Sequence, residues 1–480
     1  MKRVINVIVL IFATFICTGQ YNWKHNKTWA FGYKAGLDFT SGSPVPIATG
    51  GDTIVSSEGV ASVCDTGGHL LFYSYGTRVY NKNHVVMPNG NFIAPFFTFS
   101  TTQAAVIAPV IGSASKYYLF SLQQATIGDT AMCRLVYCIV DMSLDGGKGD
   151  VVPSTLRTFI ADSLSEKMIA ITGNNKNIWL VTHKLDTPLF LAYEITNTGI
   201  NLNPVLSACG TFKGEWGYTI GEIKASHDRR KIVSNTVSQF IPFGTQKYGT
   251  EIYDFNPANG KLSNCIVLDS INSHYGAEFS PDNSKLYTDQ RVSSDTLKIV
   301  QYDLSLSTPD LIRASKTQIA IIPKINLAPL KLGPDGKIYF ISTDTFTSPY
   351  SRFMDCITSP NSAAPACGYV YRAITMVPGT GVQFGLPNRY VTEDTVEPVI
   401  VAVTDPQNSV AIFPNPAIGD VTISSQFPIS DIKMSDMLGR TVLLKKCQMK
   451  KTESVDLSSL SAGLYFISIN SEVIVKFQKE

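Results

Sequence analysis

Short apolar and aromatic stretches recur along most of the chain and alternate with polar turns. In each recurrence, a strand rich in aromatic or β-branched residues precedes a second strand that ends in an apolar or aromatic residue, usually followed by an acid or an amide. The first strands lie at 29–31, 71–73, 117–119, 178–180, 231–233, 286–287 and 338–340. The second strands end at 37–38, 80–81, 140–141, 193–194, 253–254, 302–303 and 371–372. This pattern predicts short β-strands joined by turns.

Both series have seven members in the same order, at about 56 residues per step, slightly longer than ordinary propeller repeats. Candidates for the innermost strand of each repeat lie at 57–63, 103–110, 168–172, 219–226, 275–280, 327–332 and 381–387. The last candidate has no strands after it, and the first repeat has no innermost strand before it. A ring in which the C-terminal strand completes the first blade resolves both gaps. We therefore predict an all-β fold with a seven-bladed β-propeller over 20–391. Six or eight blades remain alternatives, because the connecting loops are long and uneven.

The composition changes after Tyr390. Residues 392–409 contain acids and two prolines and predict an extended linker, with an outer strand through 399–401 as the alternative. From 410 to 480 the alternation of apolar and polar residues resumes. It predicts a separate, small antiparallel β-sandwich.

Three resemblances follow from these patterns. The ordered set Pro414, Asn415 and Pro416, then Asp436, Gly439 and Arg440, then Gly463 and Tyr465, resembles the type A C-terminal sorting domain of the Bacteroidota type IX secretion system. This resemblance implies that the type IX secretion machinery is a partner and that the sorting domain is removed during export.

The N-terminal region resembles the propeller of gliding-motility-associated surface proteins, on residues 29–32, 35–39, 57–62, 79–84 and 384–388. Residues 279–287 resemble the Ser-Pro-Asp units of TolB-like and WD-repeat-like propellers. Neither resemblance implies an activity.

The first nineteen residues predict a secretory signal peptide. Lys2 and Arg3 precede an uncharged, largely apolar run at 4–17, and small residues at the end of this segment suit cleavage before Gln20. The run is short for a membrane anchor, and a lipoprotein site at Cys17 would follow the bulky Ile16. We predict no transmembrane segment, export through the inner membrane, and a final location at the outer-membrane surface or outside the cell.

Composition narrows the function classes. The 480 residues carry a net charge of +2, so the chain lacks the strong positive charge that is typical of nucleic-acid-binding proteins. The 44% content of hydrophobic residues excludes a disordered chain. The mature chain keeps eight cysteines, of which Cys356 and Cys367 flank a Ser/Pro/Ala-rich loop and are the candidates for a disulfide. The spacing of cysteines and histidines matches no metal motif, so we predict no metal and no cofactor.

The only candidate catalytic residues are three glutamates in innermost-strand candidates: Glu58, Glu222 and Glu278. Carboxylates that converge in a central channel would have raised pKa values and could perform acid–base work or bind a cation. Ordinary hydrogen bonds to turns are the alternative interpretation.

Two function classes therefore stay open. We favour a binding or adhesion module for a surface glycan or protein ligand, with contacts from loops at 96–99, 240–243 and 344–366. The alternative is a glycan hydrolase that uses channel carboxylates.

Overall fold

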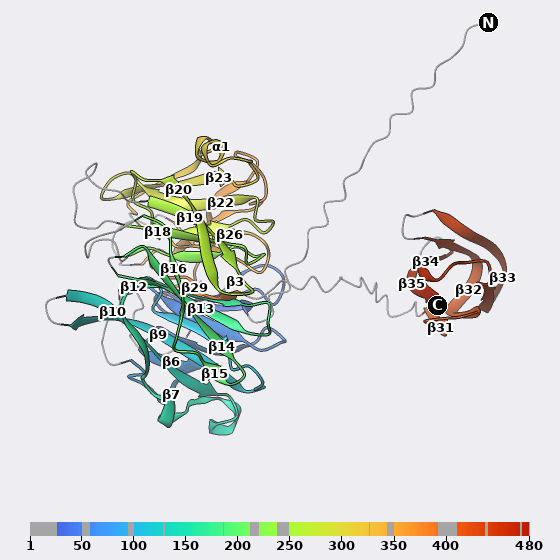
Figure 1. Ribbon diagram of the computed structural model, residues 1–480, viewed down its shortest axis with the longest axis horizontal. Helices are drawn as coiled ribbons and strands as arrows, with labels where there is room; N and C mark the ends of the chain where they lie inside the picture. The colour runs from blue at the N-terminus through green and yellow to red at the C-terminus, as the bar shows by residue number, and fades with distance from the viewer. Residues whose placement is uncertain are drawn as a thin grey trace, which may run out of the picture. The chain divides into compact units, whose positions relative to one another are not determined.

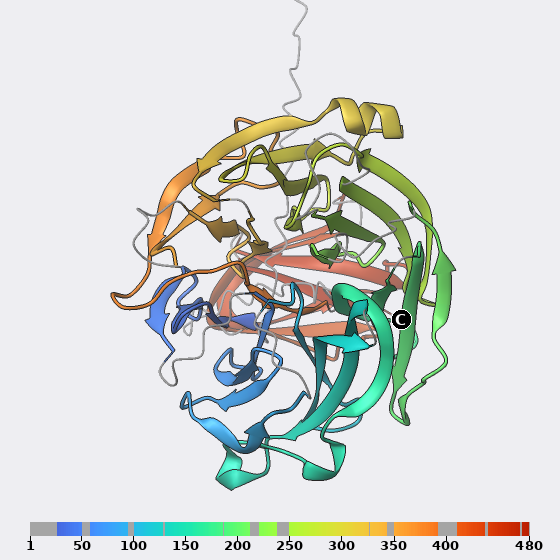
Figure 2. The same ribbon diagram turned by 90° about the vertical axis from the view of Figure 1, so that its left-hand side faces the viewer.

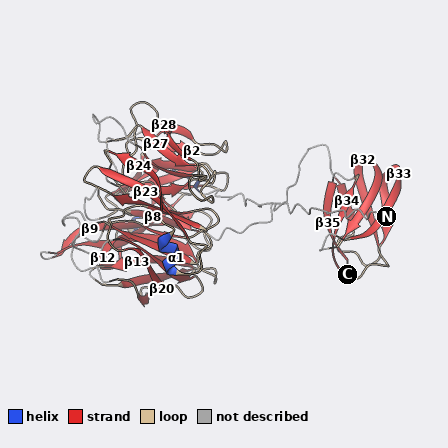
Figure 3. Ribbon diagram, turned by 90° about the horizontal axis from the view of Figure 1, so that it is seen from above, coloured by secondary structure: helices blue, strands red, loops and turns tan. Residues whose placement is uncertain are grey.

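The computed structural model describes residues 26–49, 58–94, 100–127, 130–185, 187–211, 220–237, 249–325, 327–342, 350–391, 410–436, 440–470 and 473–479. The chain forms two compact units, residues 1–395 and 396–480. Both are built almost entirely of strands (Figure 3). The predicted signal peptide and the predicted linker at 392–409 lie outside the described residues. No helix in the described ranges is long and apolar enough to cross a membrane.

The sheets of the first unit follow one another around a ring in chain order, from blue to orange in Figure 2. Figure 1 gives the strand labels. A three-stranded sheet contains β1 (Thr28–Phe31), β2 (Ala35–Asp38) and β3 (Val45–Ala48), and the next contains β4 (Val60–Cys64), β5 (Leu70–Ser74), β6 (Arg78–Asn81) and β7 (Val86–Asn91). Three further sheets have four strands each. The first contains β17 (Ile223–Ala225), β18 (Lys231–Thr236), β19 (Gly249–Asn256) and β20 (Lys261–Asp269), and the second contains β21 (Ala277–Phe279), β22 (Lys285–Arg291), β23 (Thr296–Asp303) and β24 (Thr317–Pro323). The third contains β25 (Leu330–Leu332), β26 (Ile338–Ile341), β27 (Phe353–Ile357) and β28 (Tyr369–Thr375). Helix α1 (Pro309–Ala314) connects β23 and β24.

Between these sheets lies a ten-stranded sheet. Its strands are β8 (Ala105–Pro109), β9 (Lys116–Ile127), β10 (Thr130–Asp141), β11 (Asp150–Val151), β12 (Thr158–Thr172), β13 (Ile178–Lys184), β14 (Leu189–Thr196), β15 (Gly199–Ile200), β16 (Val205–Ala208) and, through a short parallel pairing, β30 (Tyr390–Val391). Strand β12 joins two halves of the sheet. Its first residues pair with β10, and residues 168–172 pair with β13 as the innermost strand of the following half.

The turns between the first two strands of a repeat have a local chemical cause. Ser280 Oγ donates to Asp282 Oδ1 at 2.7 Å and accepts from the Lys285 backbone N–H at 2.8 Å. Ser226 makes the same two bonds, to Asp228 and from Lys231, one repeat earlier. Short polar side chains that bond to nearby backbone groups stabilise turns. The serines and aspartates of these units therefore build the hairpins.

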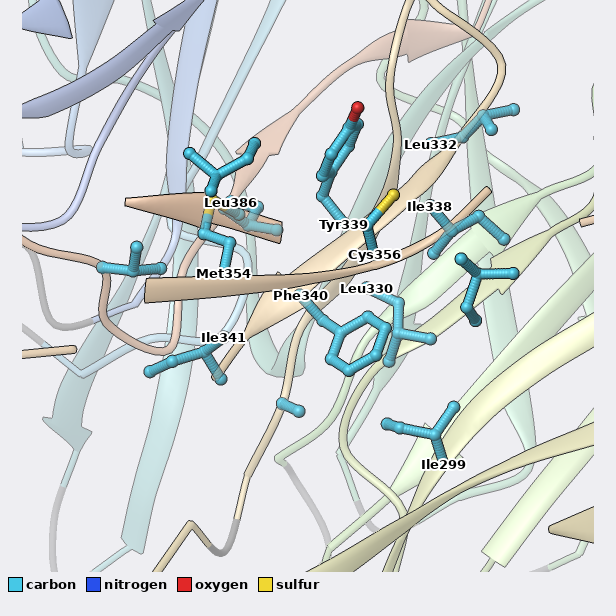
Figure 4. Packing of buried hydrophobic residues seen from close by; sticks show 14 of the residues in the cluster. Ile299, Leu330, Leu332, Ile338, Tyr339, Phe340, Ile341, Met354, Cys356 and Leu386 are labelled. Carbon is cyan, nitrogen blue, oxygen red and sulfur yellow. The ribbon is translucent and has the colours of Figure 1, made fainter. Parts of the chain in front are cut away.

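Apolar side chains between neighbouring sheets form the core. Figure 4 shows part of one cluster, in which Ile299 of β23, Leu330 of β25 and Phe340 of β26 pack in the same apolar layer. Leu386 joins this cluster from the C-terminal end of the unit. Burial of a large apolar side chain contributes about 1.5–3 kcal/mol, so this layer is a major source of stability.

The C-terminal segment 381–391 closes the ring in a way that differs from the prediction. Gly381 exchanges two backbone hydrogen bonds with Tyr33, at 2.8 and 2.9 Å, which joins the end of the unit to its beginning. The segment does not continue as an antiparallel partner of β1. Instead, β29 (Pro387–Asn388) pairs in parallel with β4, and β30 pairs in parallel with β12. Gly385 permits this route, because a Cβ there would lie 1.7 Å from the Glu58 carbonyl oxygen.

The second unit has one five-stranded sheet: β31 (Val410–Phe413), β32 (Asp420–Ser435), β33 (Thr441–Asp456), β34 (Gly463–Ile469) and β35 (Val473–Lys479). The pairing of β32 with β33 shifts register between Ser424 and Asp431. Before the shift β32 also pairs with β31, and after it β32 also pairs with β34. Ile423 and Ile432, from either side of the shift, are buried in one core.

The disulfide predicted between Cys356 and Cys367 is not formed, and both residues are free thiols. Cys356 lies opposite Tyr339 in the pairing of β26 with β27. The Cys367 side chain lies beside the hydroxyl group of Tyr287 on β22. Both thiols are buried in the same apolar cluster, where each packs as a small hydrophobic group.

Candidate functional site

A buried polar network lies at the inner edges of the sheets and contains all three predicted glutamates. Glu222 immediately precedes β17, Glu278 is the middle residue of β21, and Glu58 precedes β4. Each is at most 5% exposed. The structure places all three beside or within the innermost strands β4, β17 and β21, and a carboxylate oxygen of each accepts a hydrogen bond from a protein group.

Two of the glutamates link successive sheets. Glu222 Oε2 accepts from the Ala277 backbone N–H at 3.3 Å, and Glu278 Oε2 accepts from the Leu332 backbone N–H at 3.0 Å. The acceptor and the donor lie in neighbouring innermost strands in both cases. Burial raises the pKa of Glu222, the nearby Lys224 ammonium opposes this rise, and the Glu278 charge adds to it. These two carboxylates therefore lie close together and join adjacent sheets.

The third glutamate belongs to a different pair. Glu58 accepts from the Ser100 hydroxyl at 3.1 Å, and the charge of Glu166 on β12 acts on it. Glu166 accepts from the Thr102 backbone N–H at 2.8 Å and from Gln124 at 2.7 Å. Burial, and next the Glu166 charge, raise the pKa of Glu58 to about 8. Burial likewise raises the pKa of Glu166.

Gln103 and Asn388 connect strands that are not neighbours in the ring. The Gln103 amide donates to the Ile223 carbonyl at 3.0 Å and accepts from the Ile223 N–H at 2.9 Å, which joins the start of β8 to β17. The Asn388 amide donates to the Ala105 carbonyl at 3.1 Å. Segment 381–391 thus takes part in the network together with the side chains of the inner strands.

Sequence reasoning missed several members of this network, namely Glu166, Lys167, Lys224, Asp289 and Lys331. Asp289 accepts from the backbone N–H groups of Tyr275 at 2.6 Å and Ala328 at 3.1 Å, and burial raises its pKa to about 8. A usable signal was present in the sequence. Lys224 and Lys331 each stand between two apolar residues of an innermost strand, and a charged side chain in such a position is almost never fully buried unless it is paired.

The raised pKa of Glu58 makes stability depend on pH. The folded state holds the proton more tightly than the unfolded state, so this contribution is complete below about pH 4.5 and is lost as the pH rises through about 8. We expect Glu58→Gln, which mimics the neutral acid, to match the parent at pH 5 and to be more stable at pH 8.5, by an amount on the order of a few kcal/mol. Thermal melts at both pH values measure this difference. Asp310→Asn, at a side chain that is 90% exposed, is the control. A Glu58→Gln difference that stays constant with pH would contradict the assignment.

A separate pocket of about 600 Å³ opens beside the turns of two successive repeats. Its lining includes Asp228, Arg230, Lys231, Asp254 and Asn283, and none of the three predicted glutamates. Lys231 and Asp254 form an ion pair at 2.6 Å, so part of the charge in the pocket is already neutralised. The aromatic loop segments 96–99 and 240–243 lie outside the described residues, and so does the first part of 344–366.

The motif residues of the second unit make local contacts that define its turns. Asp436 Oδ2 accepts from Arg440 Nε at 2.7 Å, and Asp436 Oδ1 accepts from the Arg440 backbone N–H at 2.9 Å. Asn415 Oδ1, between Pro414 and Pro416, accepts from the Gln478 N–H at 3.0 Å, and the Tyr465 hydroxyl donates to the Ser461 carbonyl at 2.8 Å. Gly463 begins β34, and Gly439 lies outside the described residues. The Asn415 bond connects the two ends of the unit, and the other bonds stay within single turns.

Residues 411–479 match the secretion system C-terminal sorting domain. The match confirms the sorting domain of the type IX secretion system in this part of the chain, and such a tail implies export to the outer-membrane surface or secretion. No curated protein matches the chain.

Solved structures similar to the chain share about a tenth of its sequence. TolB from Acinetobacter baumannii is 10% identical, covers 67% of this chain and is itself covered to 62%, with a TM-score of 0.34. The periplasmic gluconolactonase PpgL from Pseudomonas aeruginosa is 10% identical, and the alignment covers 79% of this chain and 94% of the gluconolactonase, with a TM-score of 0.35. The extracellular domain of BT4673 from B. thetaiotaomicron is 8% identical, and the alignment covers 95% of this chain and 57% of that domain, with a TM-score of 0.36. With scores below 0.5, these likenesses add nothing to the strand pairing described above.

Proposed function

We propose that this protein is an exported, seven-bladed propeller that binds a glycan or protein ligand at the cell surface, delivered there by its type IX sorting domain. The blade count takes the ten-stranded sheet as two blades, because β12 changes partners from β10 to β13 along its length. The remaining five sheets of the first unit are one blade each.

The state of the three glutamates supports binding over hydrolysis. A glycosidase needs two carboxyl groups about 5–9.5 Å apart that face a bound sugar. Here Glu222 and Glu278 accept backbone N–H groups of the next innermost strand, and all three glutamates are buried. Carboxylates in such bonds stabilise the ring, and the ligand-binding role falls to the surface loops.

The test uses the secreted chain without its signal peptide on a glycan array and in a reducing-end release assay. We expect retention of specific glycans or of a surface protein, with no release of sugar. Binding by Glu222→Gln should stay within about threefold of the parent, because Glu222 contacts no ligand in this proposal. Sugar release by the parent that is lost in Glu58→Gln or Glu222→Gln, with folding intact, would establish the hydrolase instead.

A further inference from the structure

The pocket beside the turns lies between two successive sheets of the ring. Its lining comes from the turn between β17 and β18, the end of β19, the turn between β21 and β22, and the residue that follows β23. Its volume of about 600 Å³ falls within the range of small-molecule sites, about 300–1,000 Å³. The apolar residues of the lining are Phe255, Pro257, Phe279 and Leu304. The pocket therefore has room for a small molecule and offers it both apolar and polar residues.

The charges that line the pocket cancel. Asp228 and Asp254 are negative, and Arg230 and Lys231 are positive. Lys231 pairs with Asp254 at 2.6 Å, and Asp254 also accepts from the side-chain amide of Asn264 at 2.7 Å. These bonds leave one acid, Asp228, and one base, Arg230, for a ligand. Because binding sites complement the charge of their ligands, this balance favours an uncharged ligand.

Asp228 and Arg230 keep polar atoms that a ligand can bind. Asp228 Oδ1 accepts from the Ser226 hydroxyl at 2.6 Å and from the Arg230 backbone N–H at 3.1 Å. Asp228 Oδ2 and the guanidinium group of Arg230 bond to no described residue, and both residues are exposed. A carboxylate oxygen only accepts hydrogen bonds, and a guanidinium group only donates them. The pocket therefore offers a ligand one strong acceptor and several donors.

The corresponding turn of the next repeat lacks these open groups. There Asp282 takes the place of Asp228, and Ser284 takes the place of Arg230. The Ser284 hydroxyl donates to Asp282 Oδ2 at 3.0 Å, so both oxygens of this carboxylate are used within its own turn. The two turns otherwise share the same serine–aspartate and serine–backbone bonds. The arginine in place of a serine is therefore what leaves the Asp228 carboxylate open.

Two side-chain amides add donors to the lining. Asn256 Oδ1 accepts from the Ala258 backbone N–H at 3.0 Å, and Asn283 Oδ1 accepts from the His227 backbone N–H at 2.7 Å. The NH₂ group of each amide bonds to no described residue. A hydroxyl group both donates and accepts, so neighbouring hydroxyls of one molecule can satisfy the carboxylate and the donors together. A sugar has such hydroxyls, and its C–H groups suit the apolar residues of the lining.

We propose that this pocket binds an uncharged hexose unit of a glycan. The proposal deepens the glycan-binding function proposed above and rests on it. Asp228 Oδ2 accepts from one sugar hydroxyl, and the Arg230 guanidinium donates to the oxygen of another. The amides of Asn256 and Asn283 donate to further hydroxyl oxygens, and the C–H groups of the ring lie against the apolar residues.

The methyl glycosides of glucose, galactose and mannose are the probes, with glucuronate as the charged comparison. Titration of the secreted chain without its signal peptide, followed by ligand-observed NMR, measures each Kd. We expect at least one methyl hexoside to bind more tightly than glucuronate. Asp228→Asn keeps the Oδ1 acceptor of the turn and replaces only Oδ2, so it should weaken this binding at least about tenfold. Asp282→Asn, the same change in the next repeat, is the matched control and should stay within about twofold of the parent.

Arg230→Ser gives the turn the residue found in the next repeat. It should also weaken hexoside binding at least about tenfold, because the guanidinium is lost and the serine hydroxyl can occupy Asp228 Oδ2. All three substitutions lie in surface turns, so the melting temperatures should stay within about 2 °C of the parent.

The outcomes separate this site from the proposed function. Hexoside binding that is unchanged in both Asp228→Asn and Arg230→Ser would overturn the pocket as the site and leave the binding function standing. Tighter binding of glucuronate, or retention of a surface protein with no binding of any methyl hexoside, would overturn the uncharged sugar as the ligand. A chain that retains neither a glycan nor a surface protein would overturn the proposed function together with this site.

Discussion

Truncation of the chain before Gly381 will abolish cooperative folding of the propeller, whereas truncation after Ser409 will leave it folded. The shorter chain loses both hydrogen bonds to Tyr33, both parallel strand pairings and three buried apolar residues, Val382, Leu386 and Val391. Burial of these three side chains contributes about 5–9 kcal/mol. That is comparable with the whole stability of a typical protein, about 5–15 kcal/mol.

Circular dichroism melts of the two truncated chains test this prediction. Point variants distinguish the effect of losing contacts of the closing segment from the effect of an arbitrary leucine substitution. Leu386→Ala should destabilise by about 2–5 kcal/mol, as is usual for a buried leucine. Leu206→Ala, at a residue that is 49% exposed, should stay within about 0.5 kcal/mol of the parent. Equal melting temperatures for the two truncations would show that segment 381–391 does not close the ring.

Deletion of residues 410–480 will leave a folded propeller in the periplasm. The deletion removes the unit that matches the sorting domain, and the first unit has its own sheets and core. Cell fractionation should find almost all of the deleted form inside the outer membrane and almost all of the parent outside it. A melt of the periplasmic form, which should match that of the parent propeller, excludes misfolding as the cause.

A fusion experiment tests whether the sorting domain is sufficient for export. Fusion of residues 391–480 to an unrelated exported protein should carry that protein to the surface. The mature surface form of the parent should be smaller than residues 20–480 by about one sorting domain, as the family resemblance implies, unless an attached glycolipid masks the loss. Surface display of the deleted form, in a host with a working secretion system, would show that this unit is not the export signal.

Local patterns in the sequence predicted most of the strands. All seven candidate innermost segments contain or overlap a strand, namely β4, β8, the end of β12, β17, β21, β25 and, by one residue, β29. Strand periodicity and turn chemistry act over a few residues, so they can be read without knowledge of the fold. The sorting domain was equally accessible, because its motif residues form bonds that stay within one small unit.

The path of segment 381–391 could not be predicted in this way. Its apolar pattern indicated a strand, but alternation along one strand does not show with which other strand it pairs. The choice of β4 and β12 over β1 depends on contacts across more than 200 residues of sequence, such as the close passage of Gly385 along the backbone of Glu58.

The residue pattern alone predicts an all-β chain with a repeating main part, and the motif residues of the last seventy positions indicate an export signal. The role of the buried charges could be read only from the folded chain. Glu222 and Glu278 looked like catalytic candidates because they interrupt apolar strands, yet their partners are backbone N–H groups about 55 residues away in the next sheet. Lys331 stands between two leucines on β25, and the fold places its ammonium group 5.1 Å from the centre of the Trp29 ring. The physical reason is the same in both cases. Local propensity depends on neighbours along the chain, whereas the energy of a buried charge depends on whatever the fold places around it.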